Sequence, residues 1–105
     1  MKIGMVMLTF NRLEYTKIVL KNYFKKTKIS HQLHIWDNHS TDGTQEWLIK
    51  IAKKKYPVTI VLNQRNIGPQ RAIQKYFKLS KGKDLVGKID NDVLMSNRWL
   101  ENFVK

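Results

Sequence analysis

The sequence predicts an α/β fold with an open, mostly parallel sheet and helices on both of its faces. Four short apolar segments alternate along the chain with four segments whose apolar residues recur at helical spacing. Neighbouring parallel strands need helical crossovers, so this strict alternation favours a parallel sheet. A chain of 105 residues has room for one modest core, and we expect residues 1–105 to form a single domain.

The first half of the chain predicts two strand–helix units. Ile3 to Thr9 is an apolar run rich in β-forming residues, which predicts a strand buried on both faces. From Leu13 to Lys26 apolar residues return every three or four positions, which predicts a helix. Gln32 to Asp37 predicts the second strand, and about Thr44 to Lys55 predicts the second helix, which stops at Pro57.

A third unit follows. Val58 to Asn63 predicts a strand, and Pro69 predicts the first turn of a helix, where its missing N–H costs little. Gly82 is well placed just beyond the end of that helix.

The fourth unit is the weakest. Asp84 to Ile89 predicts a strand, but Gly87 and Lys88 interrupt its apolar run, which favours an edge position or a close backbone approach. Ser96 is the predicted cap of a last helix.

Composition limits the partners of the chain. The net charge of +12 attracts phosphates, whether of nucleic acid, anionic lipid or a nucleotide, although most lysines fall on predicted helices, where a solvated face explains them. The absence of cysteine excludes disulfides and thiolate zinc sites. The longest apolar run is far below the roughly 20 residues that span a bilayer, and no signal region opens the chain. We therefore expect a soluble, cytoplasmic protein with peripheral membrane contact as an option.

The few acidic residues gather at the predicted strand ends. Of eight acids, four lie at or just past the ends of the second and fourth strands: Asp37, Asp42, Asp90 and Asp92. Ligands of open α/β sheets bind at the carboxyl edge of the strands. The grouping therefore indicates a site there.

Asp90-Asn91-Asp92 has two interpretations. Alternate carboxylates can present oxygens to one point, and Mg²⁺ or Mn²⁺ prefers such oxygens and completes its shell with substrate phosphates and water. Alternatively, Asp90 and Asn91 form a turn, and Asp92 stabilises the start of the next helix.

The segment after the second strand combines two roles. Asp37 and Asn38 stand where the strand meets the crevice, and a carboxylate and an amide there can read the edge of a nucleotide base. Three residues that follow predict a cap for the second helix: Ser40, Thr41 and Asp42. His39 has no partner at ligand spacing and is interpreted as a loop residue rather than a base or metal ligand.

The loop before the third helix is a further candidate. Asn66-Ile67-Gly68, followed by Pro69, can bring backbone N–H groups to an anion, although an ordinary strand-to-helix turn would have the same sequence. Arg71 is either a phosphate ligand or a surface arginine.

Four segments of the chain match one enzyme family in order and spacing. Leu8-Thr9-Phe10-Asn11-Arg12 is similar to a Pro-Thr-Tyr-Asn-Arg opening, and Asp37 to Thr44 is similar to Asp-Asp/Asn-Gly-Ser-Thr-Asp-Gly-Thr. The spacing from Asn66 to Gly82 matches, and Asp90-Asn91-Asp92 stands at the metal-binding Asp-x-Asp. Over essentially its whole length the chain thus resembles the GT-A fold glycosyltransferases of the large inverting family that includes polysaccharide, lipopolysaccharide and rhamnan synthases.

The resemblance implies a Rossmann-like GT-A fold and transfer of a sugar, with inversion, from a nucleoside-diphosphate sugar to a sugar, lipid or protein acceptor. It implies that the donor base lies near Thr9, Phe10, Asn11, Asp37 and Asn38. The diphosphate would be held through Mn²⁺ or Mg²⁺ on Asp92, assisted by Asp90. The remaining donor contacts implied are Asn66, Gly68, Arg71 and Asn91.

Three departures from the family limit what the resemblance implies. Many uridine-specific members have a second aspartate at Asn38, so uracil, thymine and guanine all stay open as the base. The arginine common midway along the third helix is Ile73 here, and Arg71, two positions earlier, faces another direction. The chain ends at Lys105, about where the acceptor-binding half would begin, so we expect a donor-binding part and assign no catalytic base.

A second interpretation is a basic α/β module that binds nucleic acid or an anionic surface without catalysis. No helix-turn-helix, zinc ligand set or RNA-binding signature supports it, so nucleic acid is not the expected partner. A homodimer is a further option, because an uncovered acceptor face would leave apolar surface for a second copy.

Overall fold

The computed structural model of the chain describes residues 2–54, 57–90, 94–96 and 98–104. Four parallel strands form one sheet in the order β3-β2-β1-β4. The strands are β1 (Ile3–Thr9), β2 (Gln32–Asp37), β3 (Val58–Leu62) and β4 (Leu85–Ile89). The helices that alternate with them are α1 (Leu13–Lys26), α2 (Thr44–Lys54), α3 (Pro69–Leu79) and α4 (Trp99–Val104). The predicted parallel α/β fold is confirmed.

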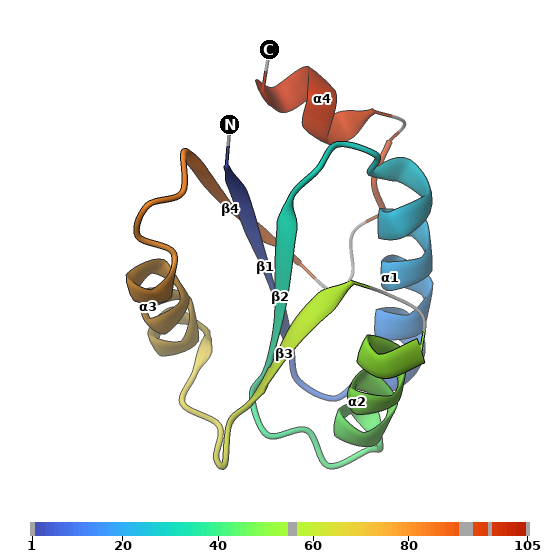
Figure 1. Cartoon of the computed structure of the whole chain (residues 1–105). Coiled ribbons are helices and arrows are strands. Elements are labelled where there is room, and N and C mark those ends of the chain that lie inside the picture. Colours follow the sequence, from blue (N-terminus) through green and yellow to red (C-terminus); the bar gives the residue numbers. More distant parts are fainter. Residues whose placement is uncertain (1, 55–56, 91–93, 97, 105) are drawn as a thin grey trace.

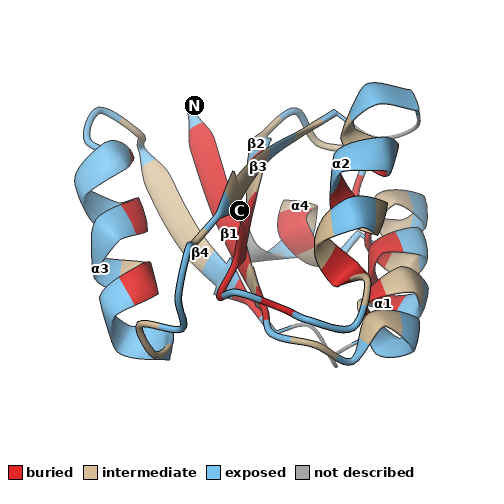
Figure 2. Ribbon diagram, turned by 90° about the horizontal axis from the view of Figure 1, so that it is seen from below, coloured by how far each residue is buried: buried red, intermediate tan, exposed pale blue. Residues whose placement is uncertain are grey.

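Helices cover both faces of the sheet, as predicted. Figure 1 shows α3 alone on one face and α1 and α2 on the other, and Figure 2 places α4 on the side of α1 and α2. The larger core cluster joins β1, β2 and β4 to α1, α2 and α4, through residues that include Met7, Leu20, Leu48 and Leu100. A smaller cluster beneath α3 contains Val6, Trp36, Ala72 and Tyr76. The sheet is therefore the middle layer of three.

The strand positions explain their composition. β1 lies inside the sheet between β2 and β4, and six of its seven residues are buried, which confirms the prediction of a strand covered on both faces. β4 is an edge strand, also as predicted. The close neighbour of Gly87 is a side chain and not the predicted backbone, because a Cβ atom there would lie 2.7 Å from Cε of Met5.

Element boundaries differ slightly from the prediction. Asn63 lies beyond β3, where its Oδ1 accepts a hydrogen bond from the indole N–H of Trp36 at 2.8 Å. Asp84 lies before β4, and its carboxylate accepts a hydrogen bond from the backbone N–H of Lys2. Lys55, the predicted end of the second helix, lies outside the described residues. The predicted Ser96 cap is wrong, because α4 begins only at Trp99.

The helices are short and turn their lysines to solvent. α1, with 14 residues, is the longest of the described helices. Exposed lysines on α1, α2 and α3 are Lys21, Lys25, Lys50, Lys53, Lys54, Lys75 and Lys78. In the described part of the chain no helix has both the length and the apolar character needed to cross a bilayer.

Candidate functional site

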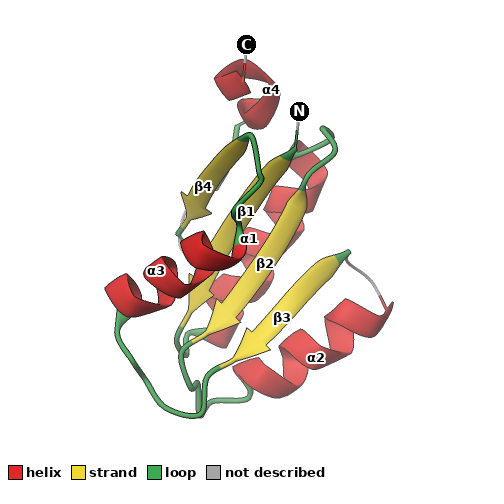
Figure 3. Ribbon diagram, turned by 60° about the vertical axis from the view of Figure 1, so that its left-hand side comes forward, coloured by secondary structure: helices red, strands yellow, loops and turns green. Residues whose placement is uncertain are grey.

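The strand order creates a crevice at the carboxyl ends of β1 and β4. The chain runs outward from β1 to β2 and β3, then crosses back over the sheet through α3 to form β4 on the other side of β1. Figure 3 shows the loops that follow β1, β2 and β3 gathered at this edge, beside the start of α3. Such a reversal of strand order is where open α/β sheets bind their ligands.

A pocket of about 310 Å³ lies at this reversal point. Its lining comes from the ends of β1 and β4 and from the start of α3: Leu8, Thr9, Phe10, Arg12, Asn66, Pro69, Lys88 and Asp90. Its size is at the lower end of the range usual for small-molecule sites. The fold thus brings together four predicted residues from three separate segments of the sequence, Thr9, Phe10, Asn66 and Asp90.

Asp37 lies buried at the end of β2, next to Thr9 of β1. Its Oδ1 accepts hydrogen bonds from the hydroxyl groups of Thr9 at 2.7 Å and Ser40 at 2.5 Å. Its Oδ2 accepts from the backbone N–H of Ser40 and from Nε2 of Gln45, both at 2.8 Å. The carboxylate, with no exposed surface, therefore joins the end of β1 to the loop before α2 and to α2 itself.

Asn38 makes a similar connection to the third strand unit. Its backbone N–H donates to the carbonyl oxygen of Thr9 at 2.8 Å. Its Oδ1 accepts hydrogen bonds from Nδ2 of Asn63 and from the backbone N–H of Ile67, both at 3.0 Å. Only 4% of Asn38 is exposed. Its side chain therefore holds the loop that leads to Asn66 and α3.

Asn11 joins the loops after β1 and β2. Its backbone N–H donates to Oγ of Ser40 at 2.6 Å, and its Oδ1 accepts from the backbone N–H of Thr41 at 2.8 Å. The residue has φ 56°, a left-handed conformation that asparagine adopts more readily than most residues. Its side chain is half-buried and lies outside the lining of the pocket.

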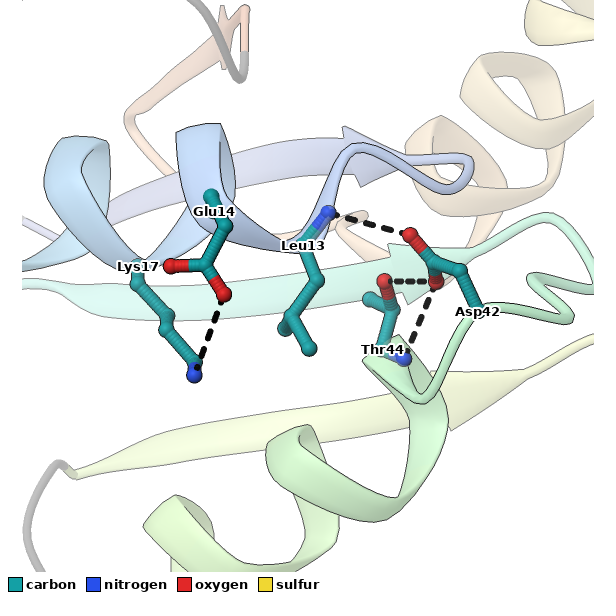
Figure 4. Close-up of polar contacts among 5 residues, drawn as sticks. All are labelled: Leu13, Glu14, Lys17, Asp42 and Thr44. Carbon is teal, nitrogen blue, oxygen red and sulfur yellow. Dashed lines mark hydrogen bonds and ion pairs between the residues drawn. The ribbon is translucent and has the colours of Figure 1, made fainter.

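Asp42 caps α2, as predicted, and also holds the start of α1 (Figure 4). Its Oδ1 accepts from the N–H of Thr44 at 3.1 Å and from that residue's hydroxyl at 2.5 Å, while Oδ2 accepts from the N–H of Leu13 at 3.1 Å. Desolvation raises the pKa of Asp42, but the hydrogen bonds from Thr44 and Leu13 outweigh it and lower that pKa below its ordinary value. The same figure shows the surface ion pair of Glu14 with Lys17, 3.5 Å apart.

The other residues of this loop have different roles. Ser40 and Thr41 contact Asp37 and Asn11 instead of capping α2. His39 is an exposed loop residue with φ 68°, and its Nδ1 lies 3.4 Å from the carbonyl oxygen of Asn63.

Among the described residues, Asp90 is the acidic side chain of the pocket lining. Its side chain is 59% exposed, and its Oδ1 lies 3.3 Å from Nζ of Lys88. Asn91 and Asp92 lie outside the described residues. Among the described residues no group of three or more His, Cys, Asp or Glu side chains is arranged to hold a metal ion. A magnesium-type site that shares its ion with substrate phosphates needs only one or two carboxylates, which Asp90 fits as one ligand.

Of the residues predicted around the start of α3, only some line the pocket. Asn66 lines the pocket, and its Oδ1 accepts a hydrogen bond from the backbone N–H of Gly68 at 2.8 Å, so that this N–H is used within the loop. Gly68 has φ 82°, which favours glycine. Arg71 is exposed on α3 and does not line the pocket.

The pocket also has two basic side chains that sequence reasoning did not assign to it, Arg12 and Lys88. The guanidinium of Arg12 lies 4.8 Å from the ring centroid of Tyr15. The signal for Lys88 was visible in the sequence, since a lysine interrupts an apolar strand two positions before Asp90.

Comparison with solved structures gives the same fold. A mannosyltransferase from Pyrobaculum calidifontis, in complex with GDP-Man and Mn²⁺, superposes with a TM-score of 0.85 at 21% identity, over 97% of this chain and 31% of that one. Residues 1–349 of TarS from S. aureus, in complex with UDP-GlcNAc, give a TM-score of 0.82 at 20% identity, over 99% of this chain and 30% of that one.

Sequence comparison gives the family. The abequosyltransferase RfbV of Salmonella typhimurium is 35% identical over 78 residues, which are 70% of this chain and 23% of that protein. The chain thus spans less than a third of the length of these relatives. The family described as Glycosyl transferase family 2 matches residues 5–105. The chain belongs to glycosyl transferase family 2 and has the GT-A-like fold of the N-terminal part of such enzymes.

Proposed function

We propose that this chain binds the nucleoside-diphosphate sugar of a glycosyltransferase, and that the complete reaction transfers the sugar to an acceptor with inversion. The observation that carries the proposal is the pocket between β1 and β4, which combines Thr9, Phe10 and Asp90 at the point of strand reversal. Membership of the family supports it, as do the GDP-Man and UDP-GlcNAc complexes of the similar structures.

The base would lie against the end of β1. Phe10 is 46% exposed at the pocket, so its ring offers an apolar surface to a planar base. Asp37, Asn38 and Asn11 hold the surrounding loops in place through the hydrogen bonds described above. Direct contact of these three residues with the base stays a prediction, and uracil, thymine and guanine stay open.

The diphosphate would lie toward β4. Asp90 would hold Mn²⁺ or Mg²⁺ together with Asp92, and the ion would neutralise the leaving diphosphate. Asn66, which also lines the pocket, would contact the donor. The contacts predicted for Gly68, Arg71 and Asn91 stay predictions.

Calorimetric titration with UDP-, dTDP- and GDP-sugars tests this proposal. In Mn²⁺ we expect binding of one nucleotide class, and in EDTA we expect that binding to be lost. Asp90→Asn and Asp92→Ala should each weaken binding, whereas Glu46→Gln, which removes an exposed charge on α2, should not. The proposal is wrong if no nucleotide sugar gives heat, or if both aspartate variants bind as the wild type does.

The net charge of +12 supports one other candidate function, a module that binds nucleic acid or anionic surfaces. Tight DNA binding that depends steeply on salt, together with no binding of nucleotide sugars, would favour that candidate.

A further inference from the structure

Lys88 occupies a position on β4 where the fold predicts an apolar residue. Side chains alternate between the two faces of a strand, so Lys88 shares the α3 side of the sheet with Val86, which packs against the small cluster beneath α3. Its neighbour in register on β1 is Val6, a fully buried member of that cluster. Figure 2 shows β4 and α3 facing each other across this side. A charged side chain has thus replaced a member of the apolar layer.

The amine of Lys88 is directed to the pocket at the strand reversal. Lys88 and Asp90 line that pocket together, and Nζ of Lys88 lies 3.3 Å from Oδ1 of Asp90. A hollow of about 510 Å³ between β4 and the first turns of α3 is also bordered by Lys88. The side chain is 46% exposed, so just over half of its surface is covered by the protein.

The stability of the fold does not explain why position 88 has a charged side chain. An ion pair as exposed as Lys88–Asp90 contributes about 0–1 kcal/mol, and an apolar side chain would instead extend the cluster beneath α3. Protection of the edge strand β4 against pairing with another chain is the remaining structural explanation of a lysine here.

We propose that Lys88 binds the diphosphate of the donor. This inference rests on the proposed function and adds a residue to it. A lysine ammonium is a compact positive charge that suits phosphate oxygens. In the free protein it neutralises Asp90; an arriving diphosphate competes for the ammonium and leaves the carboxylate oxygen of Asp90 available to a divalent cation. Lys88 would thereby couple binding of the diphosphate to binding of the divalent cation.

Affinities for a nucleoside diphosphate and for the matching nucleoside, at fixed Mn²⁺, test this role. For whichever of UDP, dTDP or GDP the wild type binds, Lys88→Met should weaken binding roughly tenfold or more, as expected for a lost hydrogen bond to a charged group. Affinity for the nucleoside should not change, because it lacks the phosphates. Lys88→Arg should keep most of the affinity, and Lys78→Met, an equal change of charge on the exposed side of α3, should keep all of it.

Binding of Mn²⁺ alone is the second measurement. Lys88→Met should bind Mn²⁺ at least as tightly as the wild type, because a positive charge beside Asp90 has been removed. A variant that loses both Mn²⁺ and nucleoside binding would indicate damage to the site and would contradict a specific role for Lys88.

The outcomes separate the two proposals. If the wild type binds a nucleoside diphosphate and Lys88→Met binds it as tightly as Lys78→Met does, the role of Lys88 is wrong and the proposed function stands. Aggregation of Lys88→Met with unchanged affinity would likewise assign the lysine to protection of the edge strand. If the wild type binds no nucleoside diphosphate, both proposals fall.

Discussion

Asp37 holds the edge of the sheet together because one buried carboxylate accepts four hydrogen bonds. The donors belong to the end of β1, the loop before α2 and α2 itself, through Thr9, Ser40 and Gln45. A buried charge is tolerated only when such donors surround it. The hydroxyl group of Thr9, which lines the pocket, is oriented by its hydrogen bond to this carboxylate.

Asp37→Asn should destabilise the fold by about 1–3 kcal/mol, because an amide NH₂ group would then face hydrogen-bond donors in a buried place. Urea unfolding measures the change. Asp90→Asn is the matched control, since Asp90 is exposed and its ion pair contributes little. Equal stabilities of the two variants would show that the hydrogen bonds of Asp37 do not hold this edge.

His34 should make stability depend on pH. Burial, followed by the nearby charge of Lys83, lowers the pKa of His34 below its ordinary value of 6.5, and its Nδ1 has no hydrogen-bond partner among the described residues. A proton therefore binds the unfolded chain more readily than the folded one. The stabilisation is complete above the unfolded pKa and falls as the pH drops below it.

Unfolding free energies measured from about pH 8 to about pH 5 should show that loss. His34→Gln should reduce the change of the unfolding free energy with pH near pH 6. His39→Gln, a change at an exposed loop residue, should leave this pH dependence as it is in the wild type. Identical slopes in the wild type and His34→Gln would contradict this assignment.

Part of the candidate site could be predicted from local sequence. Thr9, Phe10 and Asp90 lie at or just after the end of a recognisable strand, and Asn66 lies in the loop before a helix; parallel strands bring such ends to one edge. The burial of Asp37 could not be predicted, because it depends on donors from Gln45 and Ser40 that tertiary packing supplies. Lys88 was missed because its neighbours in space depend on the order of the strands in the sheet. The alternation of strands and helices along the sequence does not determine that order.

At the scale of elements, α3 packs closely on the sheet because β1 has a glycine beneath it. A Cβ atom on Gly4 would lie 2.6 Å from the hydroxyl oxygen of Tyr76, which is buried in α3. That hydroxyl has no hydrogen-bond partner among the described residues. The single oxygen atom is thus the main obstacle to a larger residue at position 4.

Gly4→Ala should therefore destabilise the protein by about 1–3 kcal/mol through overpacking. In a Tyr76→Phe background the same change should cost clearly less, since the clashing oxygen is gone. A double-mutant cycle by urea unfolding gives this coupling. Strictly additive effects would mean that α3 does not approach β1 as closely as the structure has it.

The predicted bounds of helices and strands are correct where apolar residues are regularly spaced, and the predicted start of the last helix is wrong. The bounds of β1, α1 and β2 agree with the sequence patterns, because their apolar residues are numerous and regularly spaced. Ser96 was expected to cap the last helix because serine favours that position. In the structure Arg98, with φ 55°, precedes Trp99 instead, and packing of the buried Leu100 into the core positions α4.

At the scale of the whole molecule, the reversal of strand order and the positive charge would both favour the proposed donor. The order β3-β2-β1-β4 places the pocket beside β1, and the field of a net charge of +12 would attract an anionic donor. The predicted homodimer, the cytoplasmic location and contact with a membrane surface stay predictions.

Affinity for a nucleotide sugar should fall as salt rises from about 0.05 M to about 0.5 M, because screening shortens the reach of the field. Affinity for the neutral nucleoside should change little over the same range. Calorimetry at several salt concentrations measures both. An equal salt dependence of the two ligands would contradict an electrostatic contribution to donor binding.

Under the proposed function, a divalent cation and a nucleoside diphosphate meet between β1 and β4. NMR of the ¹⁵N-labelled chain with Mn²⁺ and the bound nucleotide tests it most directly, since Mn²⁺ broadens the signals of nearby amides. We predict broadening at Thr9, Phe10, Asn66 and Asp90, with Lys2 and Asp84 at the opposite edge of the sheet left sharp. Broadening centred on the lysine-rich helices, or broadening that does not depend on the nucleotide, would show that the cation and the nucleotide do not meet at this pocket.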